Sequence, residues 1–141
     1  MDNTNKWTFD IEVFPNFFCV TFLNLEDRSI SKVFTAEEGK SDIMPLCEFL
    51  KTKMTVIGYN NTSYDNPVLR FIQGYKGVSL NKDLFALSAK LVNDSYRNDR
   101  AIMKLRYPRD IYYTWDSIDL MTLIAGDKLG ISLKQIAINL K

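Results

Sequence analysis

The chain has 141 residues, of which 46% are hydrophobic and 25% are charged, and its formal net charge is +1. This composition is typical of a soluble globular protein, and the length favours a single domain over residues 1–141. No apolar stretch approaches the roughly 20 residues that span a bilayer, so no membrane partner is expected. A charge near zero gives no overall attraction to nucleic acid, so any such binding must be local.

The sequence contains no histidine and two cysteines, Cys19 and Cys47. The absence of histidine excludes, within this chain, a Ser-His-Asp triad, a histidine-ligated zinc centre and a histidine general base. Each cysteine lies among apolar residues, which predicts two buried free thiols rather than a disulfide or a zinc site. Free thiols and the lack of a signal-peptide pattern indicate a reducing, cytoplasmic location.

The first half of the chain alternates short apolar runs with polar turns. Strands are predicted over residues 6–13, 17–24 and 29–34. These would form an antiparallel meander. Ser41 and Asp42 are suitable N-cap residues for a helix that ends near residue 53. The apolar run 54–58 predicts a buried strand, and because a helix has carried the chain back, we expect it to run parallel to the first strand.

The second half is predicted to be mostly helical apart from one polar and basic segment. Helices are predicted over residues 64–73, 80–92 and 118–125, and a last one begins at residue 132. Segment 93–110 predicts a long loop or a hairpin insertion, and the aromatic run 111–115 predicts a fifth strand. The order of these elements predicts an α/β domain with a mixed five-stranded sheet and flanking helices.

Two acidic residues, Asp10 and Glu12, interrupt an apolar run near the N-terminus. Side chains two residues apart in a strand point to the same face, and about 6.5 to 7 Å separates their Cα atoms. Two carboxylates in one half-buried patch repel each other, and a hard divalent metal is the simplest compensating cation. The alternative is a pair of solvent-facing acidic residues near a strand end.

A polar segment from Gly58 to Asp65 follows the predicted strand 54–58 and opens a helix. Open α/β sheets bind ligands at this position, the carboxyl end of a strand. If this strand lies beside the first one, Asp65 comes close to Asp10 and Glu12. The alternative is an ordinary turn in which Asp65 caps the helix.

These acidic residues lie in two motifs that resemble those of a known family, the DEDD-type (DnaQ-like) 3′-to-5′ exonucleases, in particular the proofreading domains of phage and viral DNA polymerases. The two motifs are Phe9-Asp10-Ile11-Glu12 and Asn61-x-x-Tyr64-Asp65. They are similar to the first and second exonuclease motifs of that family. The resemblance implies a ribonuclease H-like fold and a metal-dependent 3′-to-5′ exonuclease acting on single-stranded DNA 3′ ends, in a bacterial or phage-infected cell.

By this resemblance, Asp10, Glu12 and Asp65 would be the catalytic, metal-ligating carboxylates. Asn61 and Tyr64 would position the single-stranded 3′ end or the loop itself. Phosphodiester hydrolysis by two metal ions about 3.5 to 4 Å apart needs such a carboxylate cluster. Oxygen ligands select Mg²⁺ or Mn²⁺ rather than Zn²⁺.

The third motif of the family, a Tyr or His four residues before an Asp on a C-terminal helix, lacks a convincing match. We therefore expect a domain that is incomplete at its C-terminus, with weak or absent hydrolysis, and with a polymerase or the remaining nuclease segment as its partner. Tyr112 and Asp116 have the spacing but fall in a predicted strand, where residues four apart are not neighbours as on a helix. Asp119 and Asp116 are candidates for an additional carboxylate, and the alternative for Asp119 is a cap on its own short helix.

One basic stretch is a candidate nucleic-acid contact. Arg97 and Arg100, interleaved with tyrosines, would track a phosphate backbone while bases stack. Nearby aspartates dilute this charge, so a solvated surface loop is the alternative. Phe14, just past Glu12, would stack on a terminal base, with a core or rim aromatic as the alternative.

Three other functions remain open. The chain is either a catalytically silent member of the fold that binds nucleic acid or a partner protein, a nuclease that cuts internally, or a structural module. Binding of single-stranded DNA without turnover would indicate the first. Digestion of a circular or hybrid substrate would indicate the second. The third predicts no metal-induced rise in melting temperature.

Overall fold

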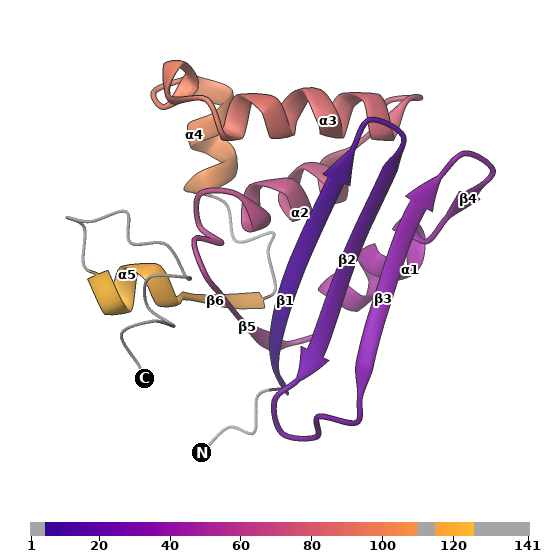
Figure 1. Ribbon diagram of the computed structural model, residues 1–141, viewed down its shortest axis with the longest axis vertical. Helices are drawn as coiled ribbons and strands as arrows, with labels where there is room; N and C mark the ends of the chain where they lie inside the picture. Colours follow the sequence, from indigo (N-terminus) through magenta and orange to yellow (C-terminus); the bar gives the residue numbers. More distant parts are fainter. Residues whose placement is uncertain (1–4, 110–114, 126–141) are drawn as a thin grey trace.

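The computed structural model describes residues 5–109 and 115–125, which form a mixed sheet with helices packed against it (Figure 1). The strands of the sheet are β1 (Asn5–Phe14), β2 (Phe17–Asn24), β3 (Ser31–Glu37), β4 (Lys40–Ser41), β5 (Met54–Gly58) and β6 (Trp115–Asp119). They lie in the order β4-β3-β2-β1-β5-β6. Strands β1 to β4 pair antiparallel in sequence order, whereas β5 runs parallel to both β1 and β6.

The helical elements are α1 (Ile43–Leu50), α2 (Asp65–Gly74), α3 (Leu80–Leu91), the 3-10 turn η1 (Asp94–Tyr96), α4 (Arg100–Arg106) and α5 (Leu120–Ala125). In Figure 1, α1 lies behind β2 and β3, and α3 runs across the end of the β1–β2 hairpin. The predicted α/β class and mixed sheet are confirmed, and the arrangement is compatible with a ribonuclease H-like fold. No helix in the described ranges is long and apolar enough to cross a membrane.

On β1, the core residues lie on one face of the sheet and the other face is exposed. Phe22 is fully buried, and its ring centroid lies 5.7 Å from that of Phe9 and 4.9 Å from that of Phe49 on α1. Because successive strand residues alternate between faces, burial of Phe9 places Asp10 and Glu12 on the opposite, exposed face.

Within the described residues, the sheet has six strands rather than the five predicted. The additional strand, β4, has two residues and pairs with the end of β3. That pairing accompanies an extension of β3 to Glu37, three residues past its predicted end. Strand β5 occupies the predicted residues 54–58 and is parallel to β1, as expected.

The prediction of a loop or hairpin over 93–110 was wrong, because this segment contains α4. Asp99 caps the helix by accepting a hydrogen bond from the Ile102 N–H at 3.1 Å, and the Ile102 side chain is buried. At the other end, Arg70 Nη1 donates to the Arg106 carbonyl at 3.0 Å. Contacts at both ends thus stabilise a helix that its own sequence pattern does not indicate.

The predicted boundary of the last strand was also wrong. The structure places Trp115 at the start of β6, which continues through Ile118 and Asp119 because these residues pair with β5. Helix α5 therefore begins at Leu120 instead of residue 118. Residues 111–114 of the predicted strand, and the helix predicted from 132, lie outside the described residues.

Two smaller expectations are corrected. Asp42 is the N-cap residue of α1, but its carboxylate accepts a hydrogen bond from the Thr35 N–H at 3.0 Å instead of capping the helix. Cys19 and Cys47 are free thiols as expected, although both are half-buried rather than fully buried. Burial raises the pKa of the Cys47 thiol.

Candidate functional site

The first two predicted carboxylates lie side by side on strand β1. Asp10 pairs across the sheet with Thr21, and Glu12 pairs with Cys19, so both acidic side chains occupy the same exposed face. Within the described residues neither carboxylate has an ion-pair partner. Among the described residues, the negative charge of this patch is therefore not compensated by an ion pair.

Asp65, the third predicted carboxylate, is the first residue of α2 and is half-buried. Its pKa rises from 3.8 to about 7, chiefly because burial disfavours the charged form. The negative charge of Asp10 raises it further, with smaller contributions from Asp119 and Glu12. The structure thus couples the three predicted carboxylates electrostatically and adds Asp119 to them.

Whether a metal ion fits depends on donor type and arrangement. The donors are carboxylate oxygens only, which are the ligands that a hard divalent cation prefers. Burial and then the charge of Asp10 raise the pKa of Asp65, and a bound cation would offset both effects. As they stand, the described residues contain no group of three acidic or other ligating side chains arranged around one ion. Asp10 and Glu12 are exposed, and exposed side chains change rotamer within nanoseconds. The donor set fits a metal, but ligation of one ion by three of these carboxylates requires other rotamers.

Asn61 lies in the loop of the second motif and is fully buried. Its Nδ2 donates hydrogen bonds to Ser117 Oγ at 2.9 Å and to the Ile118 carbonyl at 3.4 Å. A Cβ added at Gly58 would lie 3.0 Å from Asn61 Cβ and 3.1 Å from Phe9 Cε1, so glycine permits this close packing. Of the two roles predicted for Asn61, these contacts are those of a residue that positions the loop.

Tyr64, the residue before α2, is half-buried. Its hydroxyl shares a hydrogen bond with Ser88 Oγ on α3 at 2.6 Å. Burial raises the tyrosine pKa, as do the charges of Asp65 and Glu12, while the bond to Ser88 opposes them. Phe14, at the end of β1, is 49% exposed, which leaves its ring available to a ligand.

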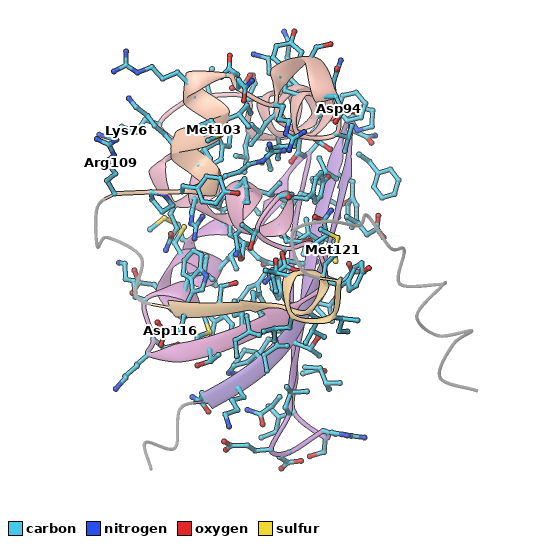
Figure 2. The ribbon with its side chains drawn as sticks, turned by 90° about the vertical axis from the view of Figure 1, so that its left-hand side faces the viewer. Lys76, Asp94, Met103, Arg109, Asp116 and Met121 are labelled. Carbon is cyan, nitrogen blue, oxygen red and sulfur yellow. The ribbon has the colours of Figure 1, made fainter. Side chains whose placement is uncertain are left out.

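The two candidates for an additional carboxylate have different surroundings. Asp116 is exposed on β6 (Figure 2). Asp119, at the end of the same strand, is 9% exposed. Asp119 Oδ1 accepts a hydrogen bond from the Met121 N–H at 3.0 Å, so the alternative prediction, a cap on its own helix, is confirmed. Tyr112 of the weak third-motif match lies outside the described residues.

Sequence reasoning missed the role of Ser117. Its Oγ accepts hydrogen bonds from Nδ2 of both Asn61 and Asn66, the latter at 2.8 Å. These partners are 56 and 51 residues away in sequence, so no local pattern could have revealed the contacts.

The predicted nucleic-acid contacts Arg97 and Arg100 are exposed; Arg97 directly follows η1, and Arg100 is the first residue of α4. Figure 2 labels Asp94, at the start of η1, and Arg109, three residues past the end of α4. Lys90 Nζ lies 5.5 Å from the ring centroid of Tyr96, a cation–π contact on the same surface. The described contacts do not join this basic surface to the carboxylates.

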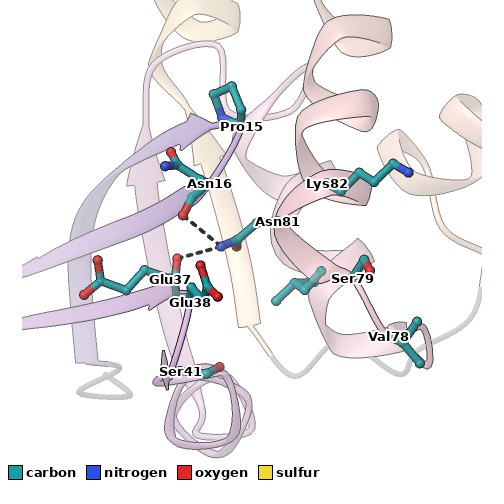
Figure 3. A pocket seen from close by; sticks show the side chains of 11 residues that line it. Pro15, Asn16, Glu37, Glu38, Ser41, Val78, Ser79, Asn81 and Lys82 are labelled. Carbon is teal, nitrogen blue, oxygen red and sulfur yellow. Dashed lines mark hydrogen bonds between the residues drawn. The ribbon is translucent and has the colours of Figure 1, made fainter.

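A separate cavity of about 440 Å³ lies between the β1–β2 turn, the β3–β4 turn and the start of α3 (Figure 3). Asn81 bridges its walls by donating hydrogen bonds to the Asn16 carbonyl at 3.2 Å and the Ala36 carbonyl at 3.1 Å. None of the predicted site residues lines this cavity. We therefore assign the candidate site to the carboxylates.

No family model matches the sequence, and neither the curated proteins nor the solved structures include a significant match to the chain. Function must therefore be argued from the chemistry of the site. The carboxylates and the loop that bears Asp65 are its principal features.

Proposed function

We propose that the chain is a DnaQ-like 3′-to-5′ exonuclease domain that uses Mg²⁺ or Mn²⁺ and acts on single-stranded DNA 3′ ends. The observation that carries the proposal is the placement of the acidic residues: Asp10 and Glu12 share the exposed face of β1, and Asp65 begins α2 just after β5, the strand that pairs with β1. The pKa of Asp65, raised to about 7 by burial and then by the charge of Asp10, supports it. Such a perturbed carboxylate next to like charges is characteristic of functional sites. A divalent cation would remove the repulsion.

The sheet supports the ribonuclease H-like part of this proposal. In the order β3-β2-β1-β5-β6, β2 runs opposite to its neighbours β1 and β3, while β5 and β6 run parallel to β1. This is the meander and crossover expected from the resemblance. It places the start of α2, and with it Asp65, after a strand that adjoins β1.

Each residue would have a distinct role in hydrolysis. Asp10, Glu12 and Asp65 would hold the cations. When bound, these ions supply a hydroxide nucleophile and stabilise the leaving 3′ oxygen. Phe14 would stack on the terminal base, and the basic surface at Arg97 and Arg100 would contact phosphates farther along the strand. The natural setting would be a phage or bacterial replication protein in the cytoplasm, with a polymerase or further nuclease segment as partner.

The test is digestion of a 5′-labelled single-stranded oligonucleotide with Mn²⁺. We expect slow, stepwise shortening from the 3′ end, in keeping with the weak hydrolysis expected from the unmatched third motif, and Glu12→Gln should abolish it. Glu26→Gln provides a matched control, because Glu26 is an exposed glutamate in the β2–β3 turn. Digestion that is equally fast in Glu12→Gln would refute the assignment, and cutting of a circular substrate would indicate an internal nuclease.

A second candidate function is a catalytically silent domain that binds nucleic acid or a partner protein. It is favoured by the absence, within residues 5–109 and 115–125, of three side chains arranged around one metal ion. This candidate predicts single-stranded DNA binding that persists in EDTA and in Glu12→Gln. It also predicts no shortened products with either Mg²⁺ or Mn²⁺.

A further inference from the structure

The loop of residues 59–64, which directly precedes Asp65, is hydrogen-bonded to the last residue of strand β6. The Asp119 carboxylate accepts hydrogen bonds from the Asn60 N–H at 2.8 Å and the Thr62 N–H at 3.0 Å. These partners are 59 and 57 residues away in sequence, so the contacts join two distant segments. They directly bracket the loop residue Asn61.

The environment of Asp119 fits this role better than the role of metal ligand. Oδ1 accepts from the Asn60 and Met121 N–H groups and Oδ2 accepts from Thr62, so both oxygens are engaged. A buried carboxylate requires such partners, and Asp119 is 9% exposed. A cation at the same oxygens would meet the positive ends of three N–H dipoles.

The loop also contains a residue in the left-handed region. Asn60 has a φ of 57°, a conformation that asparagine adopts more readily than most residues other than glycine. Arg106 provides a second attachment, because its Nε donates to the Ser63 carbonyl at 3.2 Å. The loop is therefore bonded to β6 through Asn60 and Thr62 and to α4 through Ser63.

We propose that Asp119 is a positioning residue that clamps loop 59–64 to β6 and so fixes the place of Asp65, without itself binding metal. The functional consequence rests on the proposed function, because it matters only if Asp65 is a metal ligand. The clamp leaves Asp10, Glu12 and Asp65 as the metal-binding carboxylates on the described residues. A further ligand, if the chemistry uses one, must come from elsewhere.

Amide hydrogen exchange in metal-free buffer tests the clamp directly. In Asp119→Asn, which keeps the size of the side chain, we expect the Thr62 and Asn60 amides to exchange about ten to a hundred times faster. Asp42→Asn is the matched control, since it removes another carboxylate that accepts a backbone hydrogen bond, at β3. The control should leave loop exchange unchanged. Unchanged exchange of both loop amides in a folded Asp119→Asn would overturn the proposal.

A measurement on the unaltered chain applies even if the variant does not fold. Scalar couplings across the hydrogen bonds should connect the amide nitrogens of Asn60 and Thr62 to Cγ of Asp119 in the NMR spectrum. Absence of both couplings in a spectrum that shows those of the backbone strands would overturn the clamp. Their presence supports it.

Mn²⁺ titration separates the clamp from the proposed function. We expect Asp119→Asn to bind Mn²⁺ about tenfold more weakly and Asp10→Ala to lose binding, since a mobile loop displaces one ligand without removing it. Equal loss in both variants with unchanged loop exchange would make Asp119 a ligand and refute the proposal. Failure of the unaltered chain to bind Mn²⁺ would refute the metal-dependent function, whereas the exchange result alone decides the clamp.

Discussion

Replacement of Asp65 by Asn should stabilise the metal-free protein at high pH. The pKa of Asp65 rises from 3.8 to about 7 on folding, chiefly through burial and then through the charge of Asp10. At about 1.4 kcal/mol per pH unit, this rise corresponds to a ceiling of roughly 4 kcal/mol. Rotation of exposed neighbours away from Asp65 lowers the observed value.

The sign follows from proton binding. Between about pH 4 and pH 7 the folded chain retains a proton on Asp65 that the unfolded chain has lost, so its contribution to the free energy of unfolding falls as pH rises through this window. Asn mimics the protonated acid and lacks this dependence. Asp65→Asn should therefore match the unaltered protein below about pH 4 and exceed its stability by up to roughly 4 kcal/mol above pH 7.

Urea denaturation in EDTA at a series of pH values measures this difference. Asp94→Asn is a suitable control because Asp94 is exposed in η1 and distant in sequence from the cluster. Added Mn²⁺ at pH 8 should stabilise the unaltered protein more than Asp65→Asn, because ionised Asp65 is then a ligand. The difference in stability between Asp65→Asn and the unaltered protein should change from pH 4 to pH 8. If it stays constant, the pKa of Asp65 is not raised on folding, and the reasoning is refuted.

Three further predictions concern the core, the loop and the basic surface. Phe22→Ala should lower the free energy of unfolding by about 3–5 kcal/mol in urea denaturation, because Phe22 is fully buried, and a loss below 1 kcal/mol would contradict that packing. Gly58→Ala should lower the free energy of unfolding by about 1–3 kcal/mol, because the added Cβ would crowd Asn61 and Phe9. Gly74→Ala is the control and should not destabilise the protein, because no atom lies within 4 Å of its added Cβ. Equal effects of the two substitutions would argue against the crowding. In fluorescence anisotropy with single-stranded DNA, Arg97→Ala with Arg100→Ala should reduce the slope of log affinity against log salt by about 1.4, and an unchanged slope would exclude phosphate contacts there.

The parts of the fold that sequence predicted well are those encoded locally. Strand β2 (Phe17–Asn24) and β5 (Met54–Gly58) match their predicted ranges because short β-favouring runs lie between clear turns or follow a helix. Helix α4 was missed because only Ile102 on it is buried and its last turn is capped by Arg70 from α2. A helix stabilised by distant side chains carries little periodic signal of its own.

In the candidate site, too, local features could be predicted from the sequence, whereas features that depend on distant contacts could not. Asp10 and Glu12 share the exposed face of β1 as their spacing predicts, because strand alternation is a local property. The burial of Asn61 and the engagement of both Asp119 oxygens depend on contacts across more than 50 residues. Sequence spacing could propose Asp119 as a carboxylate near the metal, but it could not show which groups already occupy its oxygens.

The cost of keeping Asp65 ionised is itself an argument for function. In a domain selected only for stability, Asn at this position would keep the shape of the side chain and remove the repulsion from Asp10. The loop holds Asp65 in this costly place through Asp119 and Arg106, whose contacts do not involve any cation. Under the proposed function, a bound cation would offset the repulsion between Asp65 and Asp10, and the structural alternative supplies no such compensation.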